Sequence, residues 1–227
     1  CKLKYEFLKS YAGNSHTTEV LPNSTSSHIN IKNEHILLLH KFLDNNPIYS
    51  SKISQQLLEI ECTIFEGDLN NYWIDSIKHD ASYAPFYPTW MLSAFSLAMK
   101  ANNLGFKQII DIGSGDGRIA YCGKVLGLDS ISIEIDENLV CMQEMLSRKT
   151  GVQFNPICSD ATVFDYNQIS KKPSIFVIGG VSEIGEVLAE SVISNVLKID
   201  HFSNSVFVLT GSHSHRKFAR DTAHFGW

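Results

Sequence analysis

The sequence predicts an α/β protein with a doubly wound, mainly parallel sheet, preceded by a helical N-terminal appendage. Two observations predict the sheet. From Tyr83 onward, short apolar runs alternate with helix-length amphipathic segments, and the first of these runs ends in three closely spaced glycines. Strands that alternate with helices through short connections form parallel sheets covered on both faces. The appendage is predicted because the first 80 residues show helical patterns without such alternation.

The elements of the sheet region follow in order along the chain. Asp136 followed by Glu137 is typical of a helix start, so Asp136 is predicted to cap the helix after the second strand. Helices are expected over 89–102, 119–125, 137–148 and 184–197. Strands are expected over 108–112, 130–135, 152–158, 174–178 and 205–209. After the last strand only 211–227 remain, too few for a helix and a final antiparallel hairpin. We therefore expect a five-stranded sheet or a truncated C-terminal hairpin.

The N-terminal region divides into a polar stretch and helical segments. Residues 1–32 carry a stretch rich in Asn, Ser and Thr after a short amphipathic opening, and they are predicted to be mostly loop. Apolar side chains at helical spacing predict helices over 33–44 and 51–61, and a further mixed stretch covers 69–77. We expect two domains, a helical region over 1–80 and a second domain over 81–227. The first would serve either as a cap that selects the substrate or as an interaction segment that makes a homodimer.

Composition narrows the class of protein. The 227 residues are 44% hydrophobic and 19% charged, which is typical of a globular protein and excludes disorder. The net charge of −5 disfavours nucleic acid as a partner. No apolar stretch reaches the roughly 18 to 20 residues that cross a bilayer, so no membrane partner is expected. The five cysteines are scattered and contain no C-x-x-C pair, which favours reduced thiols in a cytoplasmic protein over a disulfide scaffold or zinc site.

The most informative segment is IIDIGSGDGRIA, residues 109–120. A buried strand is predicted to end there in glycines just before a helix begins. Glycine permits a sharp turn and lets a ligand lie directly on the main chain, and a helix N-terminus favours a carboxylate or phosphate. The spacing is G-x-G-x-G, and Arg118 stands where the dinucleotide fingerprint requires its third glycine. An NAD site is therefore disfavoured.

Two acidic residues flank this glycine segment in the predicted fold. Glu134 lies beyond the tip of the next strand, where it can accept both hydroxyls of a ribose. Asp111 precedes the first glycine by two residues, where it suits the amino group of a cofactor better than a pyrophosphate. The alternatives are a phosphate-binding turn or a purely structural strand-turn-helix.

Three motifs in this order carry a family resemblance. They are DIGSGDG from Asp111, SIEID from Ser132, and CSDAT from Cys158. The span 83–209 resembles the class I, Rossmann-like S-adenosylmethionine (SAM)-dependent methyltransferases. The resemblance implies SAM as cofactor, Asp160 on the adenine amino group and Ile135 on the adenine ring. The cofactor-binding residues that it implies are Asp111, Gly113, Ser114, Gly115, Gly117, Glu134, Ile135, Asp160 and Ala161.

A narrower resemblance concerns SYAPFYPTWML, residues 82–92, together with DIGSGDGRIA. This pair is similar to the Tyr-x-Pro-x-Pro stretch and the D-x-G-x-G-D-G-R-I motif of small archaeal protein lysine methyltransferases and their mitochondrial relatives. It implies that Tyr83 and Pro85 lie over the SAM site, and that Asp116 and Arg118 are further family positions. One extra residue separates the prolines here. The implied reaction is methyl transfer to an amine, such as a protein lysine. There are two alternatives. The acceptor could be a small molecule, or the protein could be a non-catalytic SAM- or nucleoside-binding protein that acts through its N-terminal helices.

Candidate catalytic residues are Tyr83, near the methyl group, and Glu183, which with Glu186 could orient a cationic substrate or simply begin a helix. The segment after Ile178 is Gly-Gly-Val-Ser-Glu. Amino-methyltransferases that act on nucleobases and glutamine carry Asn/Asp-Pro-Pro-Tyr at this place, so within the resemblance its absence disfavours those acceptors. His213 and His215 lack a third ligand of clear spacing, so no metal is expected. Three further aromatic residues form either a lid or part of the core: Phe86, Tyr87 and Trp90.

Overall fold

The larger sheet is five-stranded and entirely parallel, with the strand order β6-β5-β4-β7-β8. The computed structural model describes residues 2–13, 15–26, 29–70, 72, 86–179 and 186–210. The strands are β4 (Gln108–Ile112), β5 (Asp129–Glu134), β6 (Asn155–Cys158), β7 (Ser174–Ile178) and β8 (Val206–Leu209). The helices that accompany them are α4 (Met91–Asn103), α5 (Arg118–Val125), α6 (Glu137–Thr150) and α7 (Glu186–Leu197), with short 3-10 turns η2 (Tyr166–Gln168) and η4 (Asp200–Phe202).

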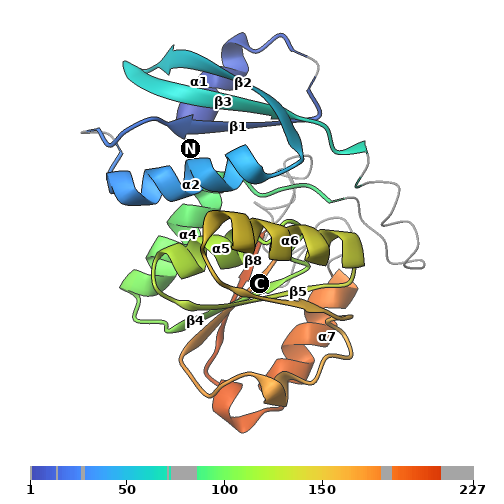
Figure 1. Cartoon of the computed structure of the whole chain (residues 1–227). Helices are drawn as coiled ribbons and strands as arrows, with labels where there is room; N and C mark the ends of the chain where they lie inside the picture. Colours follow the sequence, from blue (N-terminus) through green and yellow to red (C-terminus); the bar gives the residue numbers. More distant parts are fainter. Residues whose placement is uncertain are drawn as a thin grey trace.

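Helices cover both faces of this sheet (Figure 1). Side chains alternate across β4, so that Ile109 packs with α4, α5 and α6 whereas Ile110 packs with α7. All five residues of β4 and of β7 are buried, as expected for central strands of a covered parallel sheet. The predicted doubly wound α/β fold is therefore confirmed, and the predicted strands and helices of this region differ from those observed by a few residues at their ends.

The N-terminal region is not the helical segment that its pattern predicts. It contains helices α1 (Lys2–Ser10) and α2 (Asn33–Asn45), and strands β1 (Thr17–Pro22), β2 (Tyr49–Leu57) and β3 (Ile60–Gly67). The strands form an antiparallel sheet in the order β1-β3-β2. The helix predicted over 33–44 is confirmed, but the helix over 51–61 is wrong, and so is the loop over 1–32, because α1 and β1 lie there.

The incorrect helix is a β-hairpin. Leu58 and Glu59 form its two-residue turn with φ of 50° and 63°, which is the type I′ geometry that joins antiparallel strands. In β3 the buried side chains alternate from Ile60 through Cys62 to Ile64, whereas most of β2 is exposed. The apolar residues of the hairpin fit a helical spacing by coincidence, and the turn lacks the Asn-Gly that would signal it.

The N-terminal unit, defined as α1, β1, α2, β2 and β3, packs against the helices above the large sheet (Figure 1). Phe42 of α2 contacts Tyr121 of α5 with ring centroids 4.7 Å apart, and the Tyr121 hydroxyl donates to the Leu38 carbonyl at 2.8 Å. Lys41 Nζ donates to the carbonyl of Thr150 at the end of α6, also at 2.8 Å. One apolar core thus runs from the small sheet through α2 to the upper face of the large sheet.

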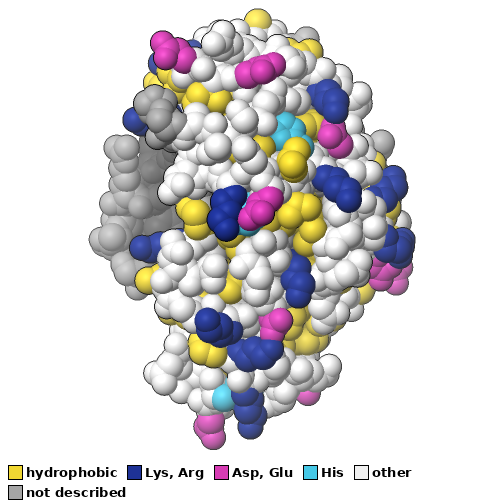
Figure 2. All heavy atoms as spheres, turned by 60° about the vertical axis from the view of Figure 1, so that its left-hand side comes forward, with side chains coloured by type: hydrophobic (Ala, Val, Ile, Leu, Met, Phe, Trp, Pro, Cys, Tyr) yellow, Lys and Arg dark blue, Asp and Glu magenta, His cyan; other side chains and the backbone are white. Residues whose placement is uncertain are grey.

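On the face shown in Figure 2, basic and acidic side chains are interspersed among uncharged ones. In the described part of the chain, no helix is both long and apolar enough to cross a bilayer.

Candidate functional site

The site centres on residues 113–117, the glycine loop that joins β4 to α5. Gly113, Gly115 and Gly117 have φ of +63°, +57° and +76°, which confirms that the turn uses backbone angles that other residues adopt at a cost. The amides of Gly113 and Ser114 donate to the Ile133 carbonyl at 2.9 and 3.2 Å, and Gly117 N donates to the Ser114 carbonyl at 2.9 Å. These bonds fix the loop against the end of β5.

The three glycines have different surroundings. A Cβ on Gly115 would lie 2.1 Å from the Phe86 ring, and one on Gly117 would lie 2.9 Å from the Gln143 side chain. Around Gly113, no described atom beyond its chain neighbours lies within 4 Å of the position that a Cβ would take. The loop is therefore packed at its middle and its end, and open at its first glycine.

Glu134 lies beside the loop because β5 runs parallel to β4, with Ile133 opposite Ile112. One carboxylate oxygen accepts the N–H of Gly115 at 2.8 Å, and the other accepts those of Ile135 and Asp136 at 2.9 and 3.1 Å. Burial raises the pKa of Glu134, and these backbone N–H groups oppose the rise. A carboxylate has about four acceptor sites, so about one remains for a ligand. A contact with both hydroxyls of a ribose would require the Gly115 N–H to turn away.

Asp111 lies beneath the loop, 2% exposed. Its carboxyl accepts the N–H of Ala120 in the first turn of α5, and its Oδ2 is buried without a hydrogen-bond partner among the described residues. Burial raises the pKa of this carboxyl well above its usual value. A cationic donor at Oδ2 would satisfy the unpaired oxygen and favour the ionised form.

Gln143 is a site residue that the sequence does not reveal. Its amide nitrogen donates to Ser114 Oγ at 2.9 Å and to the Gly115 carbonyl at 2.7 Å, while its amide oxygen accepts from Ser132 Oγ at 2.6 Å. The side chain is completely buried on α6. The signal in the sequence is a polar residue at a position of the helix where an apolar residue is expected.

Arg118 is buried at the start of α5, and all five of its N–H donors have acceptors. Nε and Nη2 donate to Asp116 at 2.9 and 2.6 Å, and Nη2 also donates to the Tyr49 hydroxyl at 3.0 Å. Nη1 donates to Glu19 Oε1 and to the Thr89 carbonyl, both at 2.7 Å. Arg118 is 1% exposed, and its guanidinium has no donor left for a ligand.

The remaining predicted cofactor residues lie on the turns after β5 and β6. The Ser159 N–H donates to the Glu134 carbonyl at 2.9 Å and brings the two turns together. Ile135 is 41% exposed there, so its side chain is available to a flat ring. Asp160 Oδ1 accepts from Thr162 N and Oγ1 at 2.8 and 2.7 Å, and Ala161 is buried. Asp136 caps α6 as predicted by accepting the Asn138 N–H at 2.8 Å.

The structure gives contacts for two residues of the predicted aromatic cluster. Phe86 lies against Gly115, whereas the Trp90 ring has Lys4 Nζ 4.9 Å from its centroid. Tyr83, Pro85, Glu183, His213 and His215 lie outside the described residues, as does the side chain of Glu186. Among the residues that the structure describes, no group of His, Cys, Asp and Glu could hold a metal ion.

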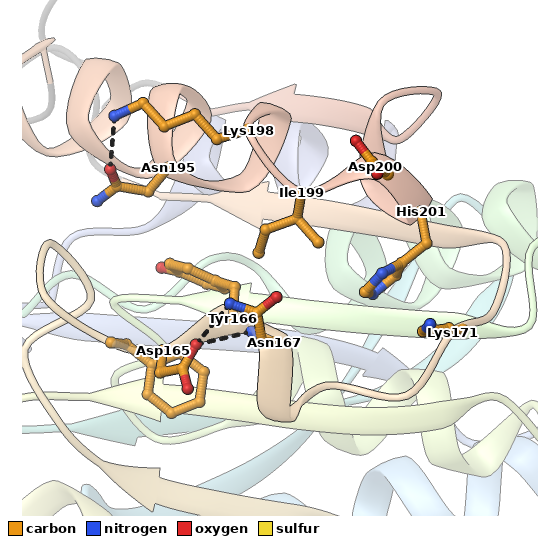
Figure 3. Close-up of a pocket in the computed structure, with 10 residues that line it drawn as sticks. Asp165, Tyr166, Asn167, Lys171, Asn195, Lys198, Ile199, Asp200 and His201 are labelled. Atoms are coloured by element: carbon orange, nitrogen blue, oxygen red, sulfur yellow. Dashed lines mark hydrogen bonds between the residues drawn. The ribbon is translucent and has the colours of Figure 1, made fainter.

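A separate cleft of about 780 Å³ lies between the segment 164–171 and the end of α7 (Figure 3). Tyr166 and Ile199 face each other across it, with His201 at one side. Its lining residues precede β7 and β8, so the cleft lies toward the amino ends of these strands. The glycine loop follows the parallel strand β4 and so lies at the opposite, carboxyl edge of the sheet. It is not part of the site around that loop.

Comparison with known proteins found no matching family model and no matching curated protein. The chain is similar to solved structures of low sequence identity. TehB from Haemophilus influenzae is 18% identical over 61% of this chain and 44% of its own length, with a TM-score of 0.36. A SAM-dependent methyltransferase from Clostridium acetobutylicum is 16% identical over 52% and 48%, with a TM-score of 0.40. The glycopeptide N-methyltransferase MtfA is 16% identical over 55% and 54%, with a TM-score of 0.39. The chain spans about half the length of these structures.

Proposed function

We propose that this protein is a SAM-dependent methyltransferase. The observation that carries the proposal is the open position at Gly113 on a loop with two buried carboxylates, Asp111 on β4 and Glu134 at the end of β5, of which Asp111 has an oxygen without a partner among the described residues. SAM offers an ammonium group and a ribose diol, which carboxylates bind, and it has no phosphate for them to repel.

The charges around the loop favour SAM over a dinucleotide. Three buried carboxyl groups lie in or next to the loop, those of Asp111, Asp116 and Glu134. Every N–H donor of the Arg118 guanidinium is bonded to a protein acceptor. A pyrophosphate needs uncommitted N–H donors and positive charge. In the described part of the site, the guanidinium of Arg118 therefore has no N–H group with which to bind a pyrophosphate.

The residues of this site would act by binding and orientation. Asp111 would take the ammonium group, Glu134 a ribose hydroxyl, and Ile135 the adenine face, with Asp160 and Ala161 beside it. When bound, SAM supplies an electrophilic methyl group on its sulfonium. The glycine loop would hold the cofactor against the main chain, and Phe86 would exclude water at Gly115. Tyr83 and Glu183 remain the proposed groups for deprotonating and orienting the acceptor.

The proposed acceptor is an amine, in particular a protein lysine. Support comes from the resemblance of residues 82–92 and 111–119 to protein lysine methyltransferases. The end of β7 is also uncrowded, since the nearest described atom to a Cβ on Gly179 would be Thr210 Oγ1 at 3.7 Å. A small-molecule acceptor is the alternative.

Calorimetric titration with SAM and with S-adenosylhomocysteine tests the cofactor. Saturable binding of both is expected, and binding of neither would contradict the proposal. Incubation with methyl-labelled SAM and a cell lysate then tests the acceptor. Label on protein lysine is expected, whereas label found only on small molecules would exclude the lysine acceptor.

A further inference from the structure

A buried polar cluster joins the N-terminal unit to the glycine loop. We call it the Arg118 cluster, and it consists of Glu19, Asn46, Tyr49, Asp116 and Arg118. Glu19 lies on β1, Asn46 follows α2, and Tyr49 begins β2, so three of its five members come from the N-terminal unit. Asp116 belongs to the glycine loop itself, and Arg118 is the first residue of α5.

Each charged side chain in this cluster has hydrogen-bond partners on more than one segment of the chain. Arg118 and Glu19 form an ion pair at 2.7 Å between side chains that are each 2% exposed. The second oxygen of Glu19 accepts the Met91 N–H at 3.1 Å, at the start of α4. Lys4 adds positive charge near Glu19 and is itself bonded to the Thr18 carbonyl. Glu19 therefore connects the small sheet to two helices of the large domain.

Asp116 is the point at which the cluster reaches the loop. It stands between Gly115 and Gly117, and its side chain is completely buried. Asn46 Nδ2 donates to Asp116 Oδ2 at 2.8 Å, and Arg118 donates to both of its oxygens. The amide oxygen of Asn46 in turn accepts the Ile48 N–H at 3.1 Å. The middle of the glycine loop is thus anchored to the segment between α2 and β2.

The chemistry of the cluster suits positioning better than stabilisation. A buried ion pair contributes little net stability compared with apolar side chains of the same volume, because both charges lose their hydration. It does fix geometry, because every N–H must meet its acceptor at hydrogen-bond distance. Removing one acceptor leaves a buried donor that can be satisfied only if the loop or helix moves.

We propose that the N-terminal unit is a positioning element of the cofactor site, and that Glu19 and Asn46 are positioning residues that act through Arg118 and Asp116 on the glycine loop. This inference rests on the proposed function. It gives the N-terminal unit a role different from both a substrate-selecting cap and a dimer-forming segment. The glycine loop keeps the geometry described above only while β1 and the α2–β2 connection are docked.

The test compares Glu19→Gln with the control Glu61→Gln. Glu61 is an exposed residue of β3, so its substitution removes the same charge from the same sheet without touching the cluster. Amide hydrogen exchange of the segment 113–118 needs no ligand and reports the loop directly. Faster exchange there than in the control is expected for Glu19→Gln, with unchanged exchange in α7.

Cofactor affinity is measured on the same folded variants. The dissociation constant for SAM should rise about tenfold in Glu19→Gln, the size expected for losing one hydrogen bond to a charged group, and should stay unchanged in Glu61→Gln. A merely structural role would lower the unfolding temperature and leave the affinity of the folded protein unaltered. Glu19→Gln with control-like loop exchange, or with control-like affinity, would overturn the inference.

If Glu19→Gln does not fold, Tyr49→Phe decides the question. It removes one acceptor of Arg118 and keeps the ring and every charge. A smaller rise in loop exchange and an about two- to fivefold weaker SAM affinity are expected, because the variant removes one uncharged acceptor and leaves Arg118 its acceptors on Asp116, Glu19 and Thr89. No change in either measurement would overturn the inference. Failure of the unaltered protein to bind SAM would instead refute the proposed function, while the exchange data would still show whether the cluster controls the loop.

Discussion

Gly113→Ala separates the cost of a backbone conformation from the loss of space for a ligand. At φ +63° an alanine is strained by about 1–2 kcal/mol, because its Cβ approaches the following carbonyl oxygen. No described atom beyond the chain neighbours stands in the way of the new methyl group, so no steric cost within the protein is added. The free energy of unfolding should therefore fall by about 1–2 kcal/mol and no more.

A ligand that lies on the main chain at Gly113 would meet this methyl group directly. Carbon atoms in contact need about 3.5–4.0 Å, so a cofactor seated on the glycine must move away by about 1 Å or more. Such a displacement weakens binding and misaligns the reacting atoms, and shifts of this size cost up to about a hundredfold in rate. We expect at least about a tenfold rise in the dissociation constant for SAM, equivalent to about 1.4 kcal/mol.

Gly151→Ala is the matched control. Gly151 ends α6 with φ +75°, and a Cβ there would also meet no described atom within 4 Å. Urea unfolding should show similar destabilisation of the two variants, and calorimetry should show weakened SAM binding for Gly113→Ala alone. Equal SAM affinity in the two variants would refute the assignment of the space above Gly113 to the cofactor.

Three further predictions concern a carboxyl group, a ring contact and a turn. Burial raises the pKa of Asp111, so above about pH 4 the folded protein holds a proton that the unfolded chain has released, and stability declines as pH rises toward the raised value. Urea unfolding of Asp111→Asn should lack this decline, and parallel pH profiles for the two proteins would contradict it. Gly115→Ala should destabilise the protein by more than the backbone strain of about 1–2 kcal/mol, because its Cβ would lie 2.1 Å from the Phe86 ring, and Phe86→Leu in the same chain should recover part of the loss in thermal unfolding. Replacing Leu58 and Glu59 by Asn-Gly should raise stability by about 1 kcal/mol in thermal unfolding, because both positions have positive φ, and a loss would show that another turn type is required.

The sequence predicts the parallel sheet well because its signals are local. The central strands β4 and β7 are short and buried throughout, and β4 is followed by glycines whose positive φ the turn requires. The N-terminal hairpin was mispredicted because most side chains of β2 are exposed, so no alternation marks the strand. Its turn at Leu58 and Glu59 adopts positive φ without the residues that favour it.

The candidate site divides in the same way. Gly113 and Glu134 could be predicted, since Gly113 follows β4 directly and Glu134 is the last residue of β5, each within one motif. Glu19 and Asn46 could not, because they meet Arg118 and Asp116 across 99 and 70 residues of chain. No periodicity within one segment records a contact between distant segments. The structure was needed to bring β1 to the glycine loop.

The shared core of the two sheets constrains the order in which the protein can fold during synthesis. The N-terminal unit leaves the ribosome before the large sheet does, but the apolar face of α2 packs on α5 and α6, and α6 ends only at residue 150. Contacts so far apart in sequence form late, and a helix face that waits for them is exposed to aggregation. The N-terminal unit therefore cannot bury the apolar face of α2 until residues that are synthesised later are available. A ribosome paused before residue 118 would hold a chain in which the carboxylate of Glu19 has no guanidinium to meet.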